Sequence, residues 1–374
     1  MNLKDNKTEA FFALLKAGLW EQGVRVLPFE PLDFESIYQL ADDQAVVGLV
    51  AAGLEHVEDR KIVKPEALPF LKKVFAQEGR NASMNAFLEK EVTRMRKAGI
   101  DPLLVKGQGV AQCYTRPQWR SAGDIDFFVD ADNYLKAKPF LSKGAESVHP
   151  EGIRSKHFCV TINGWTVELH GRLRCGLSVR SDKVIDSVQA DTFMNRNVRT
   201  WRNGETDIYL PAPDNDVIFV FTHILKHFYV GGIGLRQLCD WCRLLWTYRD
   251  SLDTGMLEQR LRSMGFLSEW HAFAAFAVDS LGMPVEAMPL YDPAPRWSRK
   301  ASRIRDFILE VGNFGKNRDM TYYEKYPYLV RKTISFGRRC GDLVRHATIF
   351  PMDSLRFFPS IVLNGLQSAA RGEG

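Results

Sequence analysis

Two aspartates one residue apart, Asp124 and Asp126, open an apolar segment in RSAGDIDFFVD (residues 120–130). In a β-strand, residues i and i+2 lie on the same face, so both carboxylates would point the same way. Like charges held this close repel each other unless a cation lies between them. A divalent cation with oxygen ligands, above all Mg²⁺, would relieve the repulsion and keep coordination positions for phosphate oxygens. A solvated strand edge or turn is the alternative interpretation.

A third carboxylate occurs in the segment WTVELHG (residues 165–171). Alternation along a strand places Glu168 and His170 on one face and Val167 and Leu169 on the other. If this strand pairs beside the aspartate strand, Glu168 adds its carboxylate to the same cation site. Otherwise it is an ordinary exposed strand glutamate.

Residues suited to phosphate surround the aspartates. In LLVKGQG a glycine directly after an apolar run lets backbone N–H groups approach a phosphate, although a simple glycine turn has the same pattern. Arginines at positions 116 and 120 precede the aspartates, and the guanidinium fork suits phosphate oxygens. The candidate phosphate-binding residues are therefore Lys106, Gly107, Gln108, Arg120 and Ser121.

A second polar set lies on two predicted helices within THILKHFYVGGIGLRQLCDWC (residues 222–242). His223 and His227 share one helix face, as do Arg236 and Asp240. Together with His170 they are candidates for lining a cleft opposite the carboxylates. The alternative is a buried Arg236–Asp240 ion pair that braces the two helices.

The same segment contains Cys239 and Cys242 after the two histidines, which is also a ligand set for zinc. Both cysteines fall inside a predicted helix, without the turn that a zinc knuckle needs. The pattern therefore favours buried small cysteines, with zinc-dependent hydrolysis as a third interpretation of the chain.

The composition is that of a soluble globular protein, with 374 residues, 45% of them hydrophobic and 25% charged. A net charge of +5 permits an anionic ligand without requiring nucleic acid. Six cysteines are too sparse for a disulfide scaffold. The first twenty residues do not resemble a signal peptide, and no apolar run is long enough to cross a membrane. We expect a cytoplasmic protein.

Hydrophobic periodicity divides the chain into four regions. Residues 1–98 are predicted to be helical, with Asp33 as an N-cap, and residues 213–290 are a helical domain, with Asp214 as an N-cap. Residues 291–374 are a basic, partly helical extension. Its basic patches are expected to be solvated helix faces, and its apolar end to pack on the domain rather than on a membrane.

Residues 99–212 are predicted to form an α/β core. The order is strand, helix, strand, helix and a hairpin around Asn163 and Gly164, a pair typical of two-residue hairpin turns. The segment DIYLPAP is expected to be an edge strand because of its prolines. The fold class is therefore α+β, a small mixed β-sheet with N-terminal and C-terminal helical modules.

Three segments, LLVKGQGVAQCYTRPQWRSAGDIDFFV, VELHGRL and HILKH…GLRQLCDWCRLL, resemble the bacterial nucleotidyltransferase family NTP_transf_5 of the polymerase-β superfamily. The resemblance covers about residues 10–290 and is sharpest between 103 and 130. It implies that Asp124 and Asp126 bind Mg²⁺ and the triphosphate, and that Glu168 is a third metal-binding acid that activates the acceptor. It also implies that the turn at Lys106, Gly107 and Gln108 holds the phosphates. The superfamily usually has Gly-Ser or Gly-Gly at this turn, and a shorter spacing to the aspartates.

The expected reaction is transfer of a nucleoside monophosphate from an NTP to a hydroxyl or phosphate acceptor. Two Mg²⁺ ions, or Mn²⁺ in their place, would lie between the three acids and the phosphates. A catalytically inactive protein that binds a nucleotide or a partner on the same fold is the rival hypothesis. Neither the acceptor nor the base is specified by a short motif, and nucleic acid is permitted as an acceptor but not required.

Overall fold

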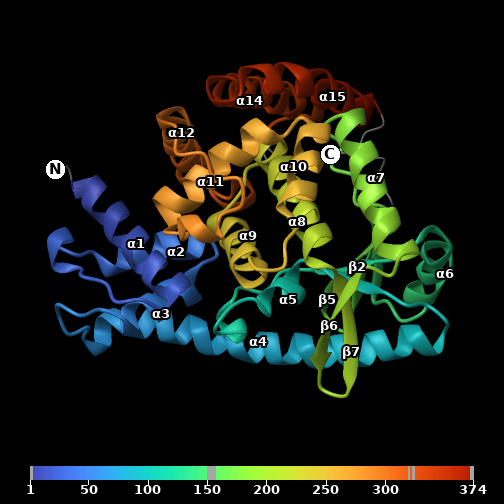
Figure 1. Cartoon of the computed structure of the whole chain (residues 1–374), viewed down its shortest axis with the longest axis horizontal. Coiled ribbons are helices and arrows are strands. Elements are labelled where there is room, and N and C mark those ends of the chain that lie inside the picture. Colours follow the sequence, from blue (N-terminus) through green and yellow to red (C-terminus); the bar gives the residue numbers. More distant parts are fainter. Residues whose placement is uncertain (1–2, 150–156, 319–320, 322–324, 371–374) are drawn as a thin grey trace.

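The computed structural model describes residues 3–149, 157–318, 321 and 325–370. One mixed β-sheet carries helices on both faces, with further helices at both ends of the chain (Figure 1). This arrangement confirms the predicted α+β class. The chain begins with α1 (Leu3–Trp20), α2 (Phe34–Asp43), α3 (Val47–Glu55) and the long α4 (Lys64–Lys97).

The N-terminal region is mainly helical, as predicted. The Asp33 side chain accepts a hydrogen bond of 3.0 Å from the Ser36 backbone N–H, which confirms it as the N-cap of α2. The helical pattern after Asp33 is interrupted between α2 and α3, where Ala45 has a φ of 57°. Helix α4 ends just before Gly99, whose φ of 73° suits a residue without a side chain.

The sheet has seven strands in the order β3-β4-β5-β2-β1-β7-β6. Strand β2 pairs in parallel with β5, and β1 with β7, whereas the other neighbours are antiparallel. The strands are β1 (Leu103–Val105), β2 (Ile125–Phe128), β3 (Ser147–His149), β4 (His157–Ile162), β5 (Trp165–His170), β6 (Val198–Asn203) and β7 (Thr206–Pro211).

Two strand predictions have opposite outcomes. The hairpin of β4 and β5 forms as predicted, and its turn residues Asn163 and Gly164 have the positive φ values, 50° and 72°, that a type I′ turn requires. The prediction of an edge strand at DIYLPAP is wrong, because β7 lies between β1 and β6. Pro211 is the last residue of β7, so its missing N–H falls at the strand end rather than within the ladder.

Two apolar clusters cover the two faces of the sheet. Leu88 of α4 and Leu141 of α6 (Ala131–Ser142) belong to the same cluster as Phe127. The opposite cluster contains Phe128 and Phe219, and joins the sheet to α7 (Val179–Met194) and α8 (Pro213–Val230). Alternation along β2 therefore directs Asp126 away from α4 and α6, toward the face that α8 covers.

The remaining helices follow α8 in the chain and pack with it in layers. Helix α8 begins after Ala212, not Asp214, because Pro213 occupies the first turn and the Asp214 side chain instead accepts a hydrogen bond from the Asp253 N–H. The later helices are α9 (Leu235–Tyr248), α10 (Thr254–Met264), α11 (Leu267–Leu281), α12 (Pro295–Val311), α14 (Tyr328–Ile349) and α15 (Pro351–Ala370). None of the helices in the described ranges combines the length and the apolar character needed to cross a bilayer.

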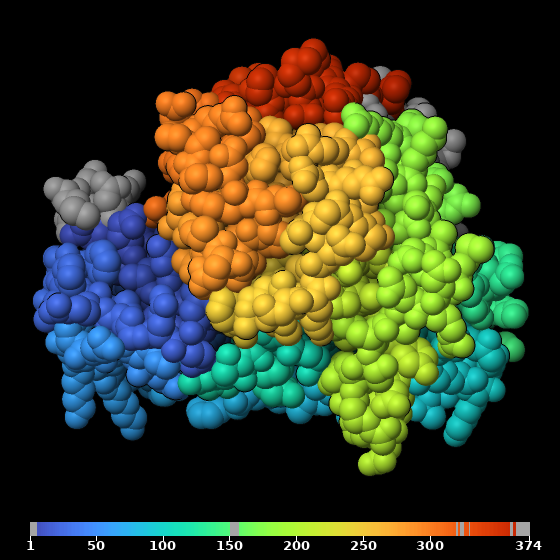
Figure 2. All heavy atoms as spheres, in the orientation of Figure 1, coloured from blue at the N-terminus to red at the C-terminus, as the bar shows by residue number. Residues whose placement is uncertain are grey.

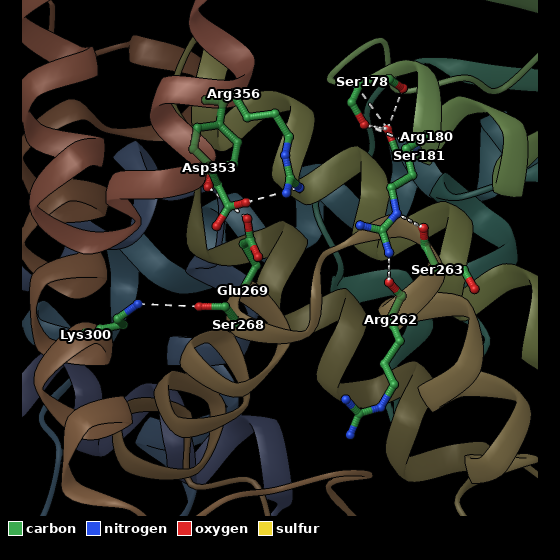
Figure 3. Close-up of polar contacts among 11 residues, drawn as sticks. Ser178, Arg180, Ser181, Arg262, Ser263, Ser268, Glu269, Lys300, Asp353 and Arg356 are labelled. Carbon is green, nitrogen blue, oxygen red and sulfur yellow. Dashed lines mark hydrogen bonds and ion pairs between the residues drawn. The ribbon is translucent and has the colours of Figure 1, made fainter.

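The C-terminal helices α14 and α15 lie along one side of the molecule, over the preceding helical layers (Figure 2). Phe350 and Phe357 are buried in the main apolar cluster, as expected for packing on the domain. Figure 3 shows Asp353 of α15 pointing toward Glu269 of α11, with Arg356 beside Asp353. The extension is therefore joined to the helical layers by both apolar and acidic contacts.

Candidate active site

Three carboxylates meet at the start of β2. Asp126 and Glu168 are register partners in the parallel pair β2 and β5, and Asp124 directly precedes β2. All three line a cavity of about 380 Å³. Burial and the negative charges of Glu168 and Asp126 raise the pKa of Asp124, which is the repulsion that the spacing predicted. The predicted meeting of the three acids therefore exists in the fold.

The turn after β1 places a cation beside these acids. Lys106 and Gly107 have φ values of 58° and 43°, and the turn directs the Lys106 Nζ to within 3.0 Å of Asp126 Oδ1. Burial opposes ionisation of Asp126, but Lys106 and a hydrogen bond with His170 outweigh it and hold the pKa of Asp126 below its ordinary value. Lys106 and Gly107 both line the cavity. The α5 helix that follows (Gly107–Ala111) is only five residues long.

Gln108 is directed away from the cavity. Its side chain is buried, and its Nε2 donates to the Oδ1 atoms of Asn81 and Asn85 on α4, at 3.2 and 2.8 Å. The side chain thus fastens α5 to α4. In this position it provides no phosphate contact.

Arg120 and Asp240, which both line the cavity, form a buried ion pair. Asp240 accepts hydrogen bonds from Arg120 Nε and Nη2 at 2.7 Å each, and from the Tyr114 hydroxyl at 2.7 Å. The alternative Arg236–Asp240 pair is therefore the wrong pairing, because Arg236 Nη1 instead donates to the Ser121 carbonyl at 3.0 Å. Ser121 contributes this carbonyl and is not a cavity-lining residue.

Arg236 is the arginine on α9 that faces the Asp pair. A side-chain carbon at Gly123, the residue before Asp124, would lie 3.3 Å from Arg236 Nη1, so the glycine permits the close approach. The Nε–H of Arg236 is buried and donates to no partner within the described part of the chain. Burial and the nearby Arg120 lower the pKa of Arg236, while Asp240 and Asp124 act in the opposite direction. Arg236 is thus a cation with unused donors at the cavity.

Helix α8 supplies the opposite wall of the cavity. The rings of His223 and His227 are 4.3 Å apart between centroids, and the ring of Phe314 lies 4.8 Å from that of His227. Burial and the charge of Lys106 lower the pKa of His223 well below its ordinary value, and burial with Lys226 lowers that of His227 to about 3. The predicted cleft residues His170, His223, His227, Arg236 and Asp240 all line this cavity.

Phe314 and His157 are among the cavity-lining residues that the sequence analysis did not predict. Phe314, in the short η4 turn (Asn313–Gly315), is 48% exposed and has a φ of 52°. His157 of β4 lies with its Nε2 3.3 Å from Glu168 Oε1. The hairpin register gives a signal for His157, because a two-residue turn at Asn163 and Gly164 places it opposite His170.

The segment that leads to the Asp pair is held by the N-terminal helices. A side-chain carbon at Gly48 of α3 would lie 2.0 Å from the Trp119 carbonyl oxygen, so only glycine permits this approach. Asn81 Nδ2 donates to the carbonyls of Gln118 and Arg120 at 2.7 and 2.8 Å. Arg116, which the sequence placed near the phosphates, instead pairs with Glu55 at 2.7 Å.

Cys239 and Cys242 are fully buried in α9, where burial raises the pKa of both thiols. They do not gather with His223 and His227 into a ligand cluster in the part of the chain that the structure describes. This placement agrees with the prediction of buried small cysteines.

The chain matches the family described as uncharacterised nucleotidyltransferase over residues 30–282, more than half of its length, and it belongs to that family. The matched range contains the three carboxylates, Lys106 and Arg236, whereas Phe314 lies beyond it. Among curated proteins and among solved structures, nothing matches the chain.

Proposed function

We propose that the chain transfers a nucleoside monophosphate from an NTP to a hydroxyl or phosphate acceptor, with a divalent cation as cofactor. The observation that carries the proposal is the convergence of Asp124, Asp126 and Glu168 in one cavity that Lys106 and Arg236 also line. Carboxylates suit a metal, and the two cations suit the phosphates of an NTP. Family membership supports nucleotidyl transfer as the general reaction.

The donor set suits Mg²⁺, or Mn²⁺ in its place. Asp124, Asp126 and Glu168 offer carboxylate oxygens, and the raised pKa of Asp124 reflects a repulsion that a bound cation would relieve. These three residues would hold the metal, whose charge offsets that of the phosphates and polarises the reacting phosphoryl group.

The remaining polar groups position the reactants. Lys106 and Arg236 bind phosphate oxygens, and the backbone at Gly107 lets a phosphate approach the turn closely. The acceptor oxygen attacks the α-phosphorus, the bond from that phosphorus to the bridging oxygen breaks, and pyrophosphate leaves. With a hydroxyl acceptor, Glu168 takes the proton at a carboxylate oxygen. Positioning and charge neutralisation therefore provide most of the catalysis.

The aromatic wall suits the nucleotide base. Phe314 is half exposed at the cavity and lies beside His227, whose low pKa keeps the imidazole neutral. Stacking of a base on an aromatic ring contributes about 1–3 kcal/mol and does not depend strongly on which base is bound. We assign Phe314 and His227 to the base.

Asp124→Asn and Asp126→Asn test the proposal. Each of the four NTPs is incubated with Mg²⁺ and a pool of sugars, small metabolites, peptides and RNA ends, and pyrophosphate release and adduct mass are measured. We expect the wild type to release pyrophosphate with at least one pool, and each variant to lose about 100-fold or more in rate. Asp132→Asn, an exposed carboxylate on α6, is the matched control and should leave the rate unchanged.

The same assay separates the rival function, an inactive nucleotide-binding protein. NTP binding is measured in parallel by calorimetry with the wild-type chain. Nucleotide binding without pyrophosphate release from any pool would favour the rival, and wild-type rates in both aspartate variants would overturn the proposed roles of the acids.

A further inference from the structure

Two histidines flank Glu168 on adjacent strands. His157 Nε2 lies 3.3 Å from Glu168 Oε1, and His170 Nε2 lies 3.4 Å from Glu168 Oε2. The two imidazole rings are 5.1 Å apart between centroids. Each histidine thus directs its own Nε2 at a different oxygen of the Glu168 carboxylate.

The three side chains have the spacing of a metal site. One ligand atom from each of His157, Glu168 and His170 can be chosen so that all lie within 4.8 Å of one another. A fourth candidate ligand atom is close, since Asp126 Oδ1 lies 2.9 Å from His170 Nε2. The side chains of His157 and Glu168 remain 25% and 22% exposed, and all four residues line the cavity, so an ion can enter.

The chemistry of this ligand set differs from that of an all-carboxylate site. Mg²⁺ takes oxygen ligands and retains several waters, whereas imidazole nitrogen suits zinc, iron, copper and nickel. Two histidines and one glutamate are the protein ligands of several catalytic zinc sites. Two nitrogens beside one or two carboxylates therefore select against Mg²⁺ at this position.

We propose that His157, Glu168 and His170 bind a transition-metal ion of the Zn²⁺ type, with Asp126 able to supply a further oxygen. The ion would share Glu168 with the set of Asp124, Asp126 and Glu168 that the proposed function assigns to Mg²⁺. The site would thus combine one oxygen-coordinated and one histidine-coordinated ion, with Glu168 shared between them.

This inference deepens the proposed function and rests on it for Glu168, but it fails in a different experiment. Metal binding is measured without nucleotide or acceptor, so an inactive protein can still contain the site. Conversely, an active nucleotidyltransferase that uses Mg²⁺ alone would not bind a transition-metal ion at His157, Glu168 and His170.

The test uses the full chain, stripped of metal with a chelator and titrated with Co²⁺ in the absence of nucleotide. We expect one Co²⁺ per chain with visible absorption bands, displaced by stoichiometric Zn²⁺ but not by millimolar Mg²⁺. His157→Gln and His170→Gln should each weaken Co²⁺ binding about tenfold or more. His56→Gln is the matched control, because His56 also contacts a carboxylate, with its Nε2 2.7 Å from Glu21 Oε2, but lies outside the cluster.

A second measurement does not depend on how the variants fold. Pulsed electron paramagnetic resonance of the wild-type chain with Cu²⁺ bound should show coupling to imidazole nitrogen. Absence of Co²⁺ binding, absence of nitrogen coupling, full displacement by Mg²⁺, or unchanged affinity in folded His157→Gln and His170→Gln would each overturn the proposal. In those cases the histidines serve only as polar partners of the Glu168 and Asp126 carboxylates.

Discussion

At the scale of single residues, the partner of a charged group decides its role. Arg120 has a guanidinium fork suited to phosphate, but Asp240 binds two of its nitrogens and both side chains are buried. Arg236, one helical turn before Asp240, keeps unused donors at the same cavity. We therefore expect Arg120 to stabilise the fold, and Arg236 to contact the ligand.

A double-mutant cycle tests this division. Arg120→Met and Asp240→Asn should each lower the free energy of unfolding by about 3–5 kcal/mol, because each leaves a buried charge without its partner. The double variant should lose less than the sum of the two. Urea unfolding of the four proteins gives the three differences. Arg202→Ala, whose ion pairs with Glu205 and Asp207 are exposed, should change stability by only about 0–1 kcal/mol.

Additive losses would show that the pair is not coupled. Unchanged stability of Arg120→Met together with weaker NTP binding would instead return Arg120 to the phosphate-binding residues.

How far the site was predictable depends on the sequence distance of each contact. Alternation predicted the face of Asp126 within β2 and of Glu168 within β5, and the pairing of the two strands, which the sequence left as a condition, brings these side chains together. The partner of Arg120 was not predictable, because Asp240 lies 120 positions away and helical spacing offered Arg236 as a nearer partner. Gln108 was misplaced for a related reason, since its contacts with α4 are tertiary.

At the scale of elements, one acidic contact couples the C-terminal helix to the helical layers. Glu269 of α11 has no exposed surface and accepts a hydrogen bond of 3.1 Å from the Tyr229 hydroxyl of α8. Asp353 of α15 faces it (Figure 3). Burial and the Asp353 carboxylate raise the pKa of Glu269 from 4.5 to about 8.

The raised pKa predicts a pH dependence of stability. Glu269 binds its proton more tightly in the folded chain than in the unfolded chain. The free energy of unfolding therefore falls as the pH rises from 4.5 to about 8, and it stays lower above that range. Glu269→Gln removes this titration. Relative to the wild type, we expect the variant to gain on the order of 4 kcal/mol of unfolding free energy between pH 5 and pH 9.

Urea unfolding at several pH values measures this difference directly. Glu258→Gln, which removes a half-exposed carboxylate on α10, is the control and should follow the wild-type profile. A parallel pH profile for Glu269→Gln and the wild type would show that Glu269 has no such pKa shift.

The elements themselves were predictable where local chemistry is strong. The Asp33 cap, the end of α4 at Gly99 and the Asn163-Gly164 hairpin are all set by residues within a few positions. Helix α7 and strand β6 were not assigned from the sequence. The position of β7 was wrong because proline indicates an edge only where its missing N–H would face a neighbouring strand, and Pro211 ends its strand.

At the scale of the whole molecule, the sheet packs on helices that come before and after the predicted α/β core (residues 99–212) in the sequence. One face packs on Leu88 and Met95 of α4, which precedes this range. The other face packs on Phe219 of α8, which follows it, and the same apolar cluster continues to Phe357 of α15. The cavity that the three carboxylates line likewise takes its second wall from α8 and α9. The proposed site is therefore a property of the assembled chain.

A fragment of residues 99–212 tests this dependence. We expect it to lack a cooperative thermal transition, because removal of α4 and α8 would expose both apolar faces of the sheet to water. Far-ultraviolet circular dichroism measures the transition, and the full chain should unfold cooperatively. A second fragment of intermediate length, residues 30–282, retains α4, α8 and α9. A cooperative transition and dispersed amide resonances in the 99–212 fragment would show that the α/β core folds independently, and that the helices serve only to complete the cavity.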